Sequence, residues 1–226
     1  LMESLAVHIP EEYLNAKEFT SQVASTVRLT DDINEITFAL ADGEQMSFSC
    51  GQYIQVKIPH AESPEGFIFR AYSIASPEYE TSTVTLNVKR IEGGIGSTWL
   101  HNLKQGDEVV FTGPYGDWSL CQATEAPLIL IGGGVGMAPM RSIILSAVRA
   151  LPEKEIQLYF GARTHKDLLY HEVFTSLAQS HPSFHYIPAL SDLGPDDSEW
   201  AGERGFIHLA FEKHFKGEGS ESQAFL

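Results

Sequence analysis

The sequence predicts two linked domains, a small antiparallel β-barrel followed by a doubly wound α/β domain with a parallel sheet. Between residues 19 and 122, apolar and polar residues alternate in short segments, as in strands with one buried face. After residue 122 the pattern changes to continuous apolar runs separated by amphipathic stretches, which is typical of parallel strands buried on both faces. We expect a linker over 1–18, the barrel over 19–122 and the α/β domain over 123–226.

The barrel prediction depends on three alternating segments. Their apolar residues are Ile36, Phe38 and Leu40; Ile54, Val56 and Ile58; and Val84, Leu86 and Val88. Turn-forming pairs such as Asp42-Gly43 and Gly113-Pro114 separate these and other segments. Several short strands within about a hundred residues indicate a small barrel or sandwich.

The α/β prediction follows the order of apolar runs and helical stripes. A glycine-rich turn follows the first apolar run, and Pro139 then opens a helix at its first helical position. The order of elements is βαβαβ, which favours a doubly wound sheet. The expected elements are strands over 126–131, 156–161 and 184–190, helices over 168–178 and 208–215, and the start of a strand at 223–226.

The composition excludes several classes of protein. Fifteen Lys and Arg residues face thirty Asp and Glu residues, and this net charge of −15 argues against a nucleic-acid partner. No apolar stretch approaches the roughly 20 residues of a membrane span. Residues 1–10 contain no basic region followed by an apolar run, so we expect no signal peptide in the sequence as given. We therefore expect a cytoplasmic location, with membrane association left to regions outside this chain or to a partner.

The metal-binding residue types form no recognisable site. Cys50 and Cys121 are too few for a disulfide framework, a four-cysteine zinc site or an iron–sulfur cluster, and they fit buried reduced thiols. Four histidines crowd one stretch without the spacing that zinc requires. These histidines are His165, His171, His181 and His185. We predict no metal site.

A glycine-rich loop stands between the first apolar run and its helix. Its glycines are Gly132, Gly133, Gly134 and Gly136. Backbone N–H groups at a helix N-terminus can hold a pyrophosphate, although a tight turn without a ligand is the plainer alternative. The usual dinucleotide fingerprint is not met, because Met137 and Pro139 stand where it needs glycine and Arg163 stands in the region of its acidic residue. We expect a nucleotide whose ribose is held differently.

A second group of polar residues lies in the barrel half. Arg70, Tyr72 and Ser73 can supply a phosphate clamp, a stacking face and a hydrogen-bond donor, although Tyr72 could instead belong to the barrel core. Another glycine turn leads into a short helix and offers N–H groups and hydroxyls to an anion. Its candidate residues are Gly94, Gly96, Ser97 and Thr98. One anion site in each domain predicts two nucleotide-like cofactors.

Taken in order, these motifs resemble the ferredoxin–NADP reductase superfamily over about residues 19–226. The motifs are Arg70-x-Tyr72-Ser73, Gly94-x-x-Ser97, Gly113-Pro114-x-Gly116, the run at 132–139, and Tyr159 to Arg163 followed by Asp167 to Tyr170. The chain looks most like the flavin domain of the F subunits of Na⁺-translocating NADH:quinone reductases and of related oxygenase reductases. Residues 10–17 are similar to the linker that follows a plant-type ferredoxin domain in those proteins.

The resemblance implies FAD and NADH as cofactors and a role for each barrel motif. Arg70 would neutralise the FAD pyrophosphate, Tyr72 would stack on the isoalloxazine, and Ser73 would bind flavin N5. Val88 and Lys89 would offer backbone contacts to the flavin. The glycine turn, through Gly96, Ser97 and Thr98, would cap the pyrophosphate.

The resemblance also implies a dinucleotide site in the second domain. Its implied residues are Gly132, Gly133, Gly134, Gly136, Pro139, Gly161, Arg163, Ser191 and Asp192. Asp192 would favour NADH, because it can bind a free ribose hydroxyl and repels a 2′-phosphate. The plainer alternatives are a surface salt bridge for Arg163 and a simple turn at Ser191-Asp192.

The activity implied is hydride transfer from NADH to FAD, followed by single-electron transfer to a 2Fe–2S domain or protein or to another acceptor. A free-flavin NAD(P)H reductase and a non-catalytic nucleotide-binding module remain as alternatives. Two departures from the family pattern affect this interpretation. The family continues with a Cys-Gly-Pro-Pro segment after its last strand, and its ferredoxin domain has a CxxxxCxxC run. Neither occurs in the 226 residues, so we expect both outside this chain and the α/β domain to be incomplete at its C-terminus.

Overall fold

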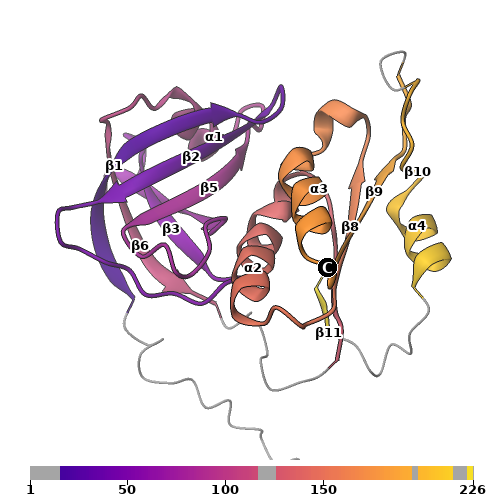
Figure 1. Cartoon of the computed structure of the whole chain (residues 1–226). Helices are drawn as coiled ribbons and strands as arrows, with labels where there is room; N and C mark the ends of the chain where they lie inside the picture. The colour runs from indigo at the N-terminus through magenta and orange to yellow at the C-terminus, as the bar shows by residue number, and fades with distance from the viewer. Residues whose placement is uncertain (1–15, 117–125, 195–197, 216–222, 226) are drawn as a thin grey trace, which may run out of the picture.

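The chain forms two domains that lie side by side in a computed structural model (Figure 1). The model describes residues 16–116, 126–194, 198–215 and 223–225. The first domain is a curled antiparallel sheet, and the second is a parallel sheet with helices on both faces. The fold class predicted from the sequence is confirmed.

Six strands and one helix build the first domain. They are β1 (Lys17–Arg28), β2 (Ile33–Leu40), β3 (Tyr53–Pro59), β4 (Phe67–Ser73), β5 (Thr83–Lys89), α1 (Ile95–Asn102) and β6 (Glu108–Tyr115). The strand order is β4-β3-β6-β1-β2-β5, and the edge strands approach each other where Ile74 bridges Leu86. The sheet is therefore a half-barrel with α1 beside its open edge. The three alternating segments of the sequence are β2, β3 and β5, as predicted.

The alternation of residues in these strands fills the inside of the half-barrel. Ile36, Phe38, Ile54 and Phe111 are fully buried there, and the rings of Phe38 and Phe111 stack with centroids 6.2 Å apart. Burying side chains of this size contributes about 1.5–3 kcal/mol each. This core holds β4 and β5 at fixed positions, and both strands carry predicted site residues.

The second domain has a five-stranded parallel sheet in the order β10-β9-β8-β7-β11. Helices α2 and α3 cover the face toward the half-barrel, and α4 lies on the other face (Figure 1). The elements are β7 (Leu128–Gly132), α2 (Met137–Ala150), β8 (Ile156–Ala162), α3 (His171–Ser180), β9 (Phe184–Leu190), β10 (Glu203–Arg204), α4 (Ile207–His214) and β11 (Gln223–Phe225).

Some predicted boundaries are wrong by two or three residues. Helix α2 begins at Met137, so Pro139 is its third residue; proline is tolerated there because the first turn needs no N–H donor. Helix α3 begins at His171 and not at residue 168, because Leu168 is extended and Tyr170 has a left-handed backbone conformation. Strand β1 begins at Lys17, inside the expected linker.

Other expectations fall partly outside the described residues. The first fifteen residues of the expected linker and the expected domain boundary at 122–123 lie outside them. Cys50 is buried, whereas Cys121 lies outside the described residues. Within the described ranges, no helix is both long enough and apolar enough to cross a membrane.

The two domains share an interface along helix α2. The side chains of Ile33 and Cys50, from the first domain, belong to the same buried cluster as the core of the second. Arg141 of α2 donates a hydrogen bond from Nη1 to the carbonyl oxygen of Ala75 at 2.7 Å. Eight residues further along α2, the Arg149 guanidinium lies over a tyrosine ring of the first domain, 4.2 Å from its centroid. One face of α2 thus lies against the segment that follows β4.

Candidate functional site

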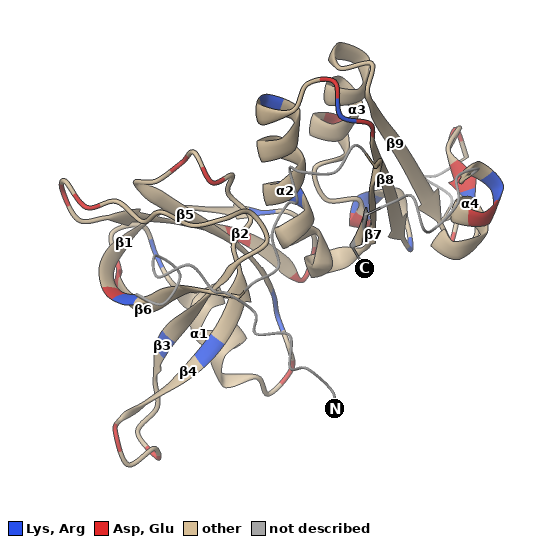
Figure 2. Cartoon of the chain, turned by 90° about the horizontal axis from the view of Figure 1, so that it is seen from below, with Lys and Arg blue, Asp and Glu red and all other residues tan. Residues whose placement is uncertain are grey.

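The two predicted clusters of the half-barrel meet at its open edge. Strand β4 carries Arg70 and Tyr72, and Gly96 lies in the first turn of α1. A Cβ atom on Gly96 would lie 2.9 Å from the Tyr72 hydroxyl and 3.0 Å from Cγ of Arg70, so only glycine fits without displacing them. Figure 2, in which Lys and Arg are blue, shows the basic residue of β4 next to α1. A cation, an aromatic ring and a helix N-terminus therefore converge.

The side chains in this cluster differ in their exposure to solvent and in their hydrogen bonds. Arg70 is exposed, and its Nη1 donates to the carbonyl oxygen of Phe69 at 2.8 Å. Tyr72 is half-buried against the barrel core, as the plainer alternative predicts, and this burial raises its pKa. The Ser97 hydroxyl accepts a hydrogen bond from the Ile91 N–H at 3.1 Å and is almost fully buried. Ser97 thus holds the glycine turn in shape, and the backbone N–H groups are what the turn offers to an anion.

The ends of β4 and β5 carry the remaining predicted residues of the first domain. Ser73 ends β4 and is half-buried. Nε2 of His101, on α1, lies 2.8 Å from the carbonyl oxygen of Val88. Lys89, the next residue of β5, lies in the cleft between the domains. His101 was not predicted, because its contact with β5 depends on how α1 packs.

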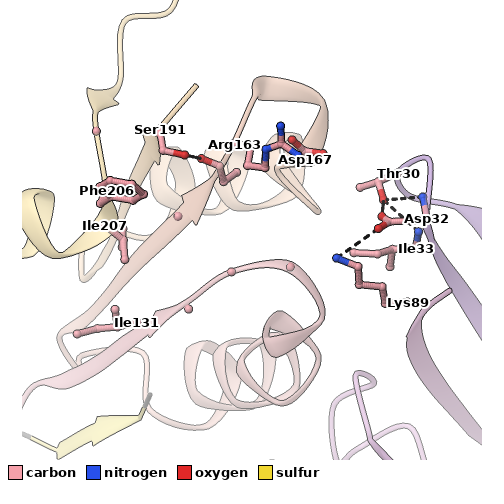
Figure 3. Close-up of a pocket in the computed structure, with 16 residues that line it drawn as sticks. Thr30, Asp32, Ile33, Lys89, Ile131, Arg163, Asp167, Ser191, Phe206 and Ile207 are labelled. Carbon is pink, nitrogen blue, oxygen red and sulfur yellow. Dashed lines mark hydrogen bonds and ion pairs between the residues drawn. The ribbon is translucent and has the colours of Figure 1, made fainter. Parts of the chain in front are cut away.

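A cleft of about 560 Å³ separates the two domains (Figure 3). Figure 3 shows Arg163, Asp167 and Ser191 on one side and Thr30, Asp32 and Lys89 on the other. The second domain lines the cleft with Ile131, Gly132, Gly133, Gly134, Gly161, Ala162, Arg163, Asp167, Ser191, Gly205, Phe206 and Ile207. The first domain lines it with Thr30, Asp32, Ile33 and Lys89. Most residues of the predicted dinucleotide site therefore face the end of β5.

The glycines of the loop after β7 have different surroundings. A Cβ atom on Gly133 would fall inside van der Waals contact with the carbonyl oxygen of Gly161, which is backbone of β8. At Gly136 nothing lies within 4 Å of such an atom, and its φ of −60° suits any residue. Of these two positions, only Gly133 requires glycine, because β7 and β8 approach each other closely there. Pro139 does not line the cleft and lies buried in the first turn of α2.

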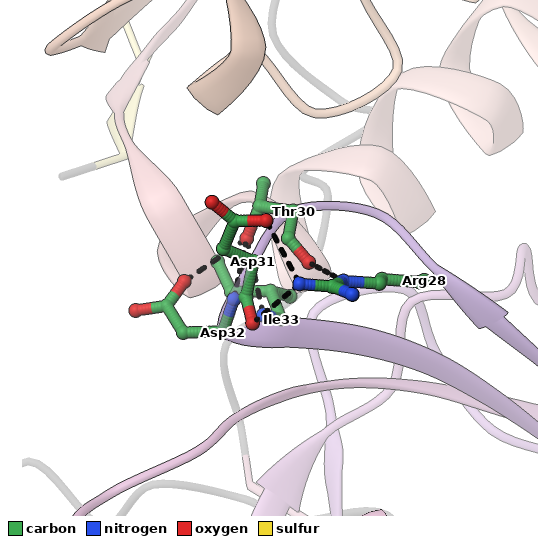
Figure 4. Close-up of polar contacts among 5 residues, drawn as sticks. All are labelled: Arg28, Thr30, Asp31, Asp32 and Ile33. Carbon is green, nitrogen blue, oxygen red and sulfur yellow. Dashed lines mark hydrogen bonds and ion pairs between the residues drawn. The ribbon is translucent and has the colours of Figure 1, made fainter.

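The turn between β1 and β2 forms the opposite wall of the cleft. Figure 4 shows the polar contacts within this turn. The Thr30 hydroxyl donates to Asp32 at 2.9 Å and accepts from the Ile33 N–H at 3.0 Å. Asp32 pairs with Nζ of Lys89 at 3.3 Å. Although partial burial opposes ionisation, hydrogen bonds from Thr30 and Lys89 and the charge of Lys89 hold the pKa of Asp32 below its usual range. Arg28 fixes the turn from outside through Asp31 at 2.8 Å.

Two comparisons with known protein families match the two domains separately. The model of the oxidoreductase FAD-binding domain matches residues 20–120. The model of the oxidoreductase NAD-binding domain matches residues 130–226. The two matches, in this order, cover most of the chain.

The chain belongs to the ferredoxin reductase superfamily. Among its relatives is the F subunit of the Na⁺-translocating NADH-quinone reductase of Pseudomonas aeruginosa, 32% identical over 95% of this chain and 61% of that protein. The reductase component DmpP of phenol 2-monooxygenase, from Pseudomonas sp. strain CF600, is 34% identical over 93% of this chain and 58% of that protein. The chain thus spans about three fifths of the length of these curated relatives.

Solved structures of the superfamily show the same fold. The Amycolatopsis cytochrome P450 reductase GcoB superposes with a TM-score of 0.79 at 30% identity, over 92% of this chain and 61% of that one. The flavohem-like FAD/NAD-binding domain of a Vibrio cholerae nitric oxide dioxygenase has a TM-score of 0.77 at 22% identity, over 91% of this chain and 85% of that one. The second likeness shows the fold alone.

Within this family fold, Arg163 and Asp192 lie together at the rim of the cleft. Their side chains pair at 3.6 Å, with 80% and 65% of each exposed. The N–H groups of Ser191 and Asp192 donate to the carbonyl oxygens of Ala162 and Arg163 at 3.0 and 2.8 Å. The surface salt bridge, which was the plainer alternative for Arg163, occurs, and the two N–H groups extend the pairing of β9 with β8 beyond the strand end. A pair this exposed contributes at most about 1 kcal/mol, so it does not prevent a ligand from displacing it.

Several residues of the cleft were not predicted as site residues. Phe206 lines it with 66% of its side chain exposed, directly after Gly205, whose φ is +105°. The sequence pattern that could have identified Phe206 is an aromatic residue that directly follows a glycine. Asp167 was also missed; its carboxylate accepts hydrogen bonds from the N–H and hydroxyl of Thr164, both at 3.0 Å, and so fixes the loop after β8.

Proposed function

We propose that this chain transfers hydride from NADH to FAD and passes the electrons singly to an acceptor, a 2Fe–2S domain or protein being the first candidate. The observation that carries this proposal is the cleft between the domains. Its walls are the glycine loop of the NAD-binding domain and the end of β5 from the FAD-binding domain. A two-electron donor and its acceptor need to meet at such a junction, because hydride transfer requires contact between the reacting atoms.

The residues of the half-barrel fit FAD. Arg70 is exposed beside the N-terminus of α1, where a pyrophosphate would receive both a guanidinium and backbone N–H groups. The missing side chain of Gly96 keeps the space between them open. Tyr72 presents an aromatic ring one position before Ser73, so a flavin ring and a hydroxyl donor would be close together.

The residues of the cleft fit NADH. The glycine loop lies at the start of α2, where the helix dipole favours a pyrophosphate. Across the cleft, Asp32 holds Lys89 in an ion pair, which fixes the wall that a nicotinamide would face. Phe206 offers an exposed ring at the rim.

When bound, FAD supplies the chemistry, since it accepts hydride at N5 and releases electrons one at a time. The chain contributes binding and orientation. Arg70 would neutralise phosphate charge, Tyr72 would fix the plane of the flavin, and the hydroxyl of Ser73 would donate a hydrogen bond to N5. The buried core behind β4 and β5 keeps these groups in place.

NADH is the preferred donor in this proposal. Asp192 stands at the rim beside Arg163, so any 2′-phosphate that Arg163 attracts would also lie near a carboxylate. A 2′-phosphate carrying about −1.5 to −2 charge would also be repelled by the Asp192 carboxylate. A free ribose hydroxyl can instead donate a hydrogen bond to that carboxylate.

The decisive experiment is anaerobic mixing of the FAD-loaded protein with NADH while the flavin absorbance is followed. We expect the absorbance to be lost, with one FAD retained per chain after desalting, and a reduced 2Fe–2S ferredoxin to form when the oxidised ferredoxin is added. Loss of all FAD on desalting together with turnover of added riboflavin would identify the free-flavin reductase. NADH binding without loss of absorbance would identify the nucleotide-binding module and refute the proposal.

A further inference from the structure

We propose that Tyr170 is a positioning residue that locks the NAD-binding domain against the FAD-binding domain and so sets the distance for hydride transfer. Its hydroxyl lies 2.7 Å from Oε2 of Glu35 and 2.6 Å from the side-chain amide of Asn87. Glu35 and Asn87 are direct partners on β2 and β5, and Tyr170 precedes α3 of the other domain. This inference rests on the proposed function.

The backbone at Tyr170 is held in an unfavourable conformation. Its φ is 60° and its ψ 24°, in the left-handed region, and it is the one non-glycine residue with positive φ among the described residues. Such a conformation is uncommon for an aromatic residue and persists where surrounding contacts determine it. Here the side chain is held by Glu35 and Asn87 of the first domain and by Arg141 and Phe174 of its own domain.

Arg141, from the same domain as Tyr170, links the ring of Tyr170 to the first domain. The guanidinium of Arg141, on α2, lies over this ring at 4.8 Å from its centroid. The same guanidinium donates to the carbonyl oxygen of Ala75 at 2.7 Å. Ala75 follows the end of β4 by two residues, so Arg141 ties the ring to the strand that carries Ser73.

The chemistry of the groups around the Tyr170 hydroxyl determines which group donates the proton in each of its two hydrogen bonds. A phenol has one proton, and a carboxylate has only acceptors, so the proton of Tyr170 is donated to Glu35. Asn87 is buried, and its Nδ2 has no hydrogen-bond partner among the described residues. In the structure Oδ1 of Asn87 faces the Tyr170 hydroxyl. We assign the amide with its oxygen and nitrogen exchanged, so that Nδ2 donates to the Tyr170 oxygen, because the single phenol proton is donated to Glu35.

The position of this contact explains why it bears on hydride transfer. Asn87 and Lys89 lie on the same face of β5, two residues apart, and Lys89 lines the cleft. Two residue pairs along the same two strands, Ile33 is paired with Lys89, and Ile33 lines the cleft as well. Tyr170 therefore fixes the other domain two residue pairs away from the proposed meeting point of nicotinamide and flavin. A shift of about 1 Å there can cost a hundredfold in rate.

The test replaces Tyr170 with phenylalanine, which removes the hydroxyl and keeps the ring. A matched control is Tyr159→Phe, because the buried Tyr159 hydroxyl bonds Gln157 on the same strand, away from the interface. A second variant, Asn87→Asp, removes the donor from the barrel side and leaves the NAD-binding domain unchanged.

The FAD-loaded proteins are mixed with NADH in single turnovers, with and without deuterium at the transferred position. We expect Tyr170→Phe and Asn87→Asp to lower the limiting rate of flavin reduction by about ten- to a hundredfold. The dissociation constant for NADH and the FAD content should stay unchanged, and the isotope effect should stay equal or rise. Tyr159→Phe should behave as the wild type.

Three results would overturn the inference. The first is a wild-type limiting rate in Tyr170→Phe. The second is a loss confined to NADH affinity or FAD content, since the hydroxyl would then support binding or folding alone. The third is an equal loss in Tyr159→Phe. If the wild-type protein itself fails to reduce FAD, the proposed function is refuted, and the inference that rests on it falls with it.

Discussion

Replacing Gly133 with alanine should damage the NAD-binding domain while leaving the FAD-binding domain intact. The new methyl group would meet the carbonyl oxygen of Gly161, which belongs to β8 and is held between β7 and β9. That oxygen cannot move alone, so the glycine loop must give way by about 1 Å, and such overpacking costs about 1–3 kcal/mol. For a chain of this size, each kcal/mol lowers the Tm by about 2–4 °C.

The same displacement should weaken NADH binding. A phosphate that loses one charge-assisted hydrogen bond loses about 1.5–3 kcal/mol, which is a factor of ten or more in Kd. Thermal unfolding followed by circular dichroism and titration with NADH measure the two effects, and the FAD content should remain that of the wild type. Gly136→Ala is the matched control for stability, since its methyl group meets nothing and should raise stability by about 0.4–1 kcal/mol. A Gly133→Ala protein with the Tm of Gly136→Ala and wild-type NADH affinity would refute the reasoning.

Three further predictions concern FAD affinity, the choice between NADH and NADPH, and the dependence of stability on pH. Arg70→Ala should raise the Kd for FAD by about ten- to a hundredfold, from the loss of one Arg–phosphate bond of about 1.5–3 kcal/mol, whereas Lys57→Ala on the adjacent strand should not; equal affinities would remove Arg70 from the site. Asp192→Arg should shift the ratio of kcat/KM values tenfold or more toward NADPH, and an unchanged ratio in steady-state kinetics would contradict the preference for NADH. Burial and the neighbouring His165 lower the pKa of His171, so the unfolded chain takes up the proton first as the pH falls below about 6.5, and unfolding becomes easier on acidification. Urea melts of His171→Phe should show a flatter dependence on pH in that range than the wild type or His185→Gln, and an identical dependence would contradict this origin.

The sequence by itself predicted the strands and helices because their patterns are local. The alternation at Ile54, Val56 and Ile58 is sufficient for a strand with one buried face, and the structure has β3 there. The motifs around Arg70 and Gly133 could also be found in the sequence. A glycine turn before a helix, as at Gly133, can bind an anion in any fold, because its backbone N–H groups are unpaired. Boundaries such as the start of α3 were missed, because the left-handed backbone conformation of Tyr170 depends on contacts with other elements.

The tertiary structure alone decided how the two domains face each other. Asp32 and Lys89 meet because β2 and β5 pair in one register, and no local pattern contains that register. Tyr170 reaches Glu35 across 135 positions of sequence, so the contact follows from the packing of whole domains. The physical reason is that backbone conformation and hydrophobic periodicity act over a few residues, whereas a cleft between domains arises where distant surfaces exclude water together.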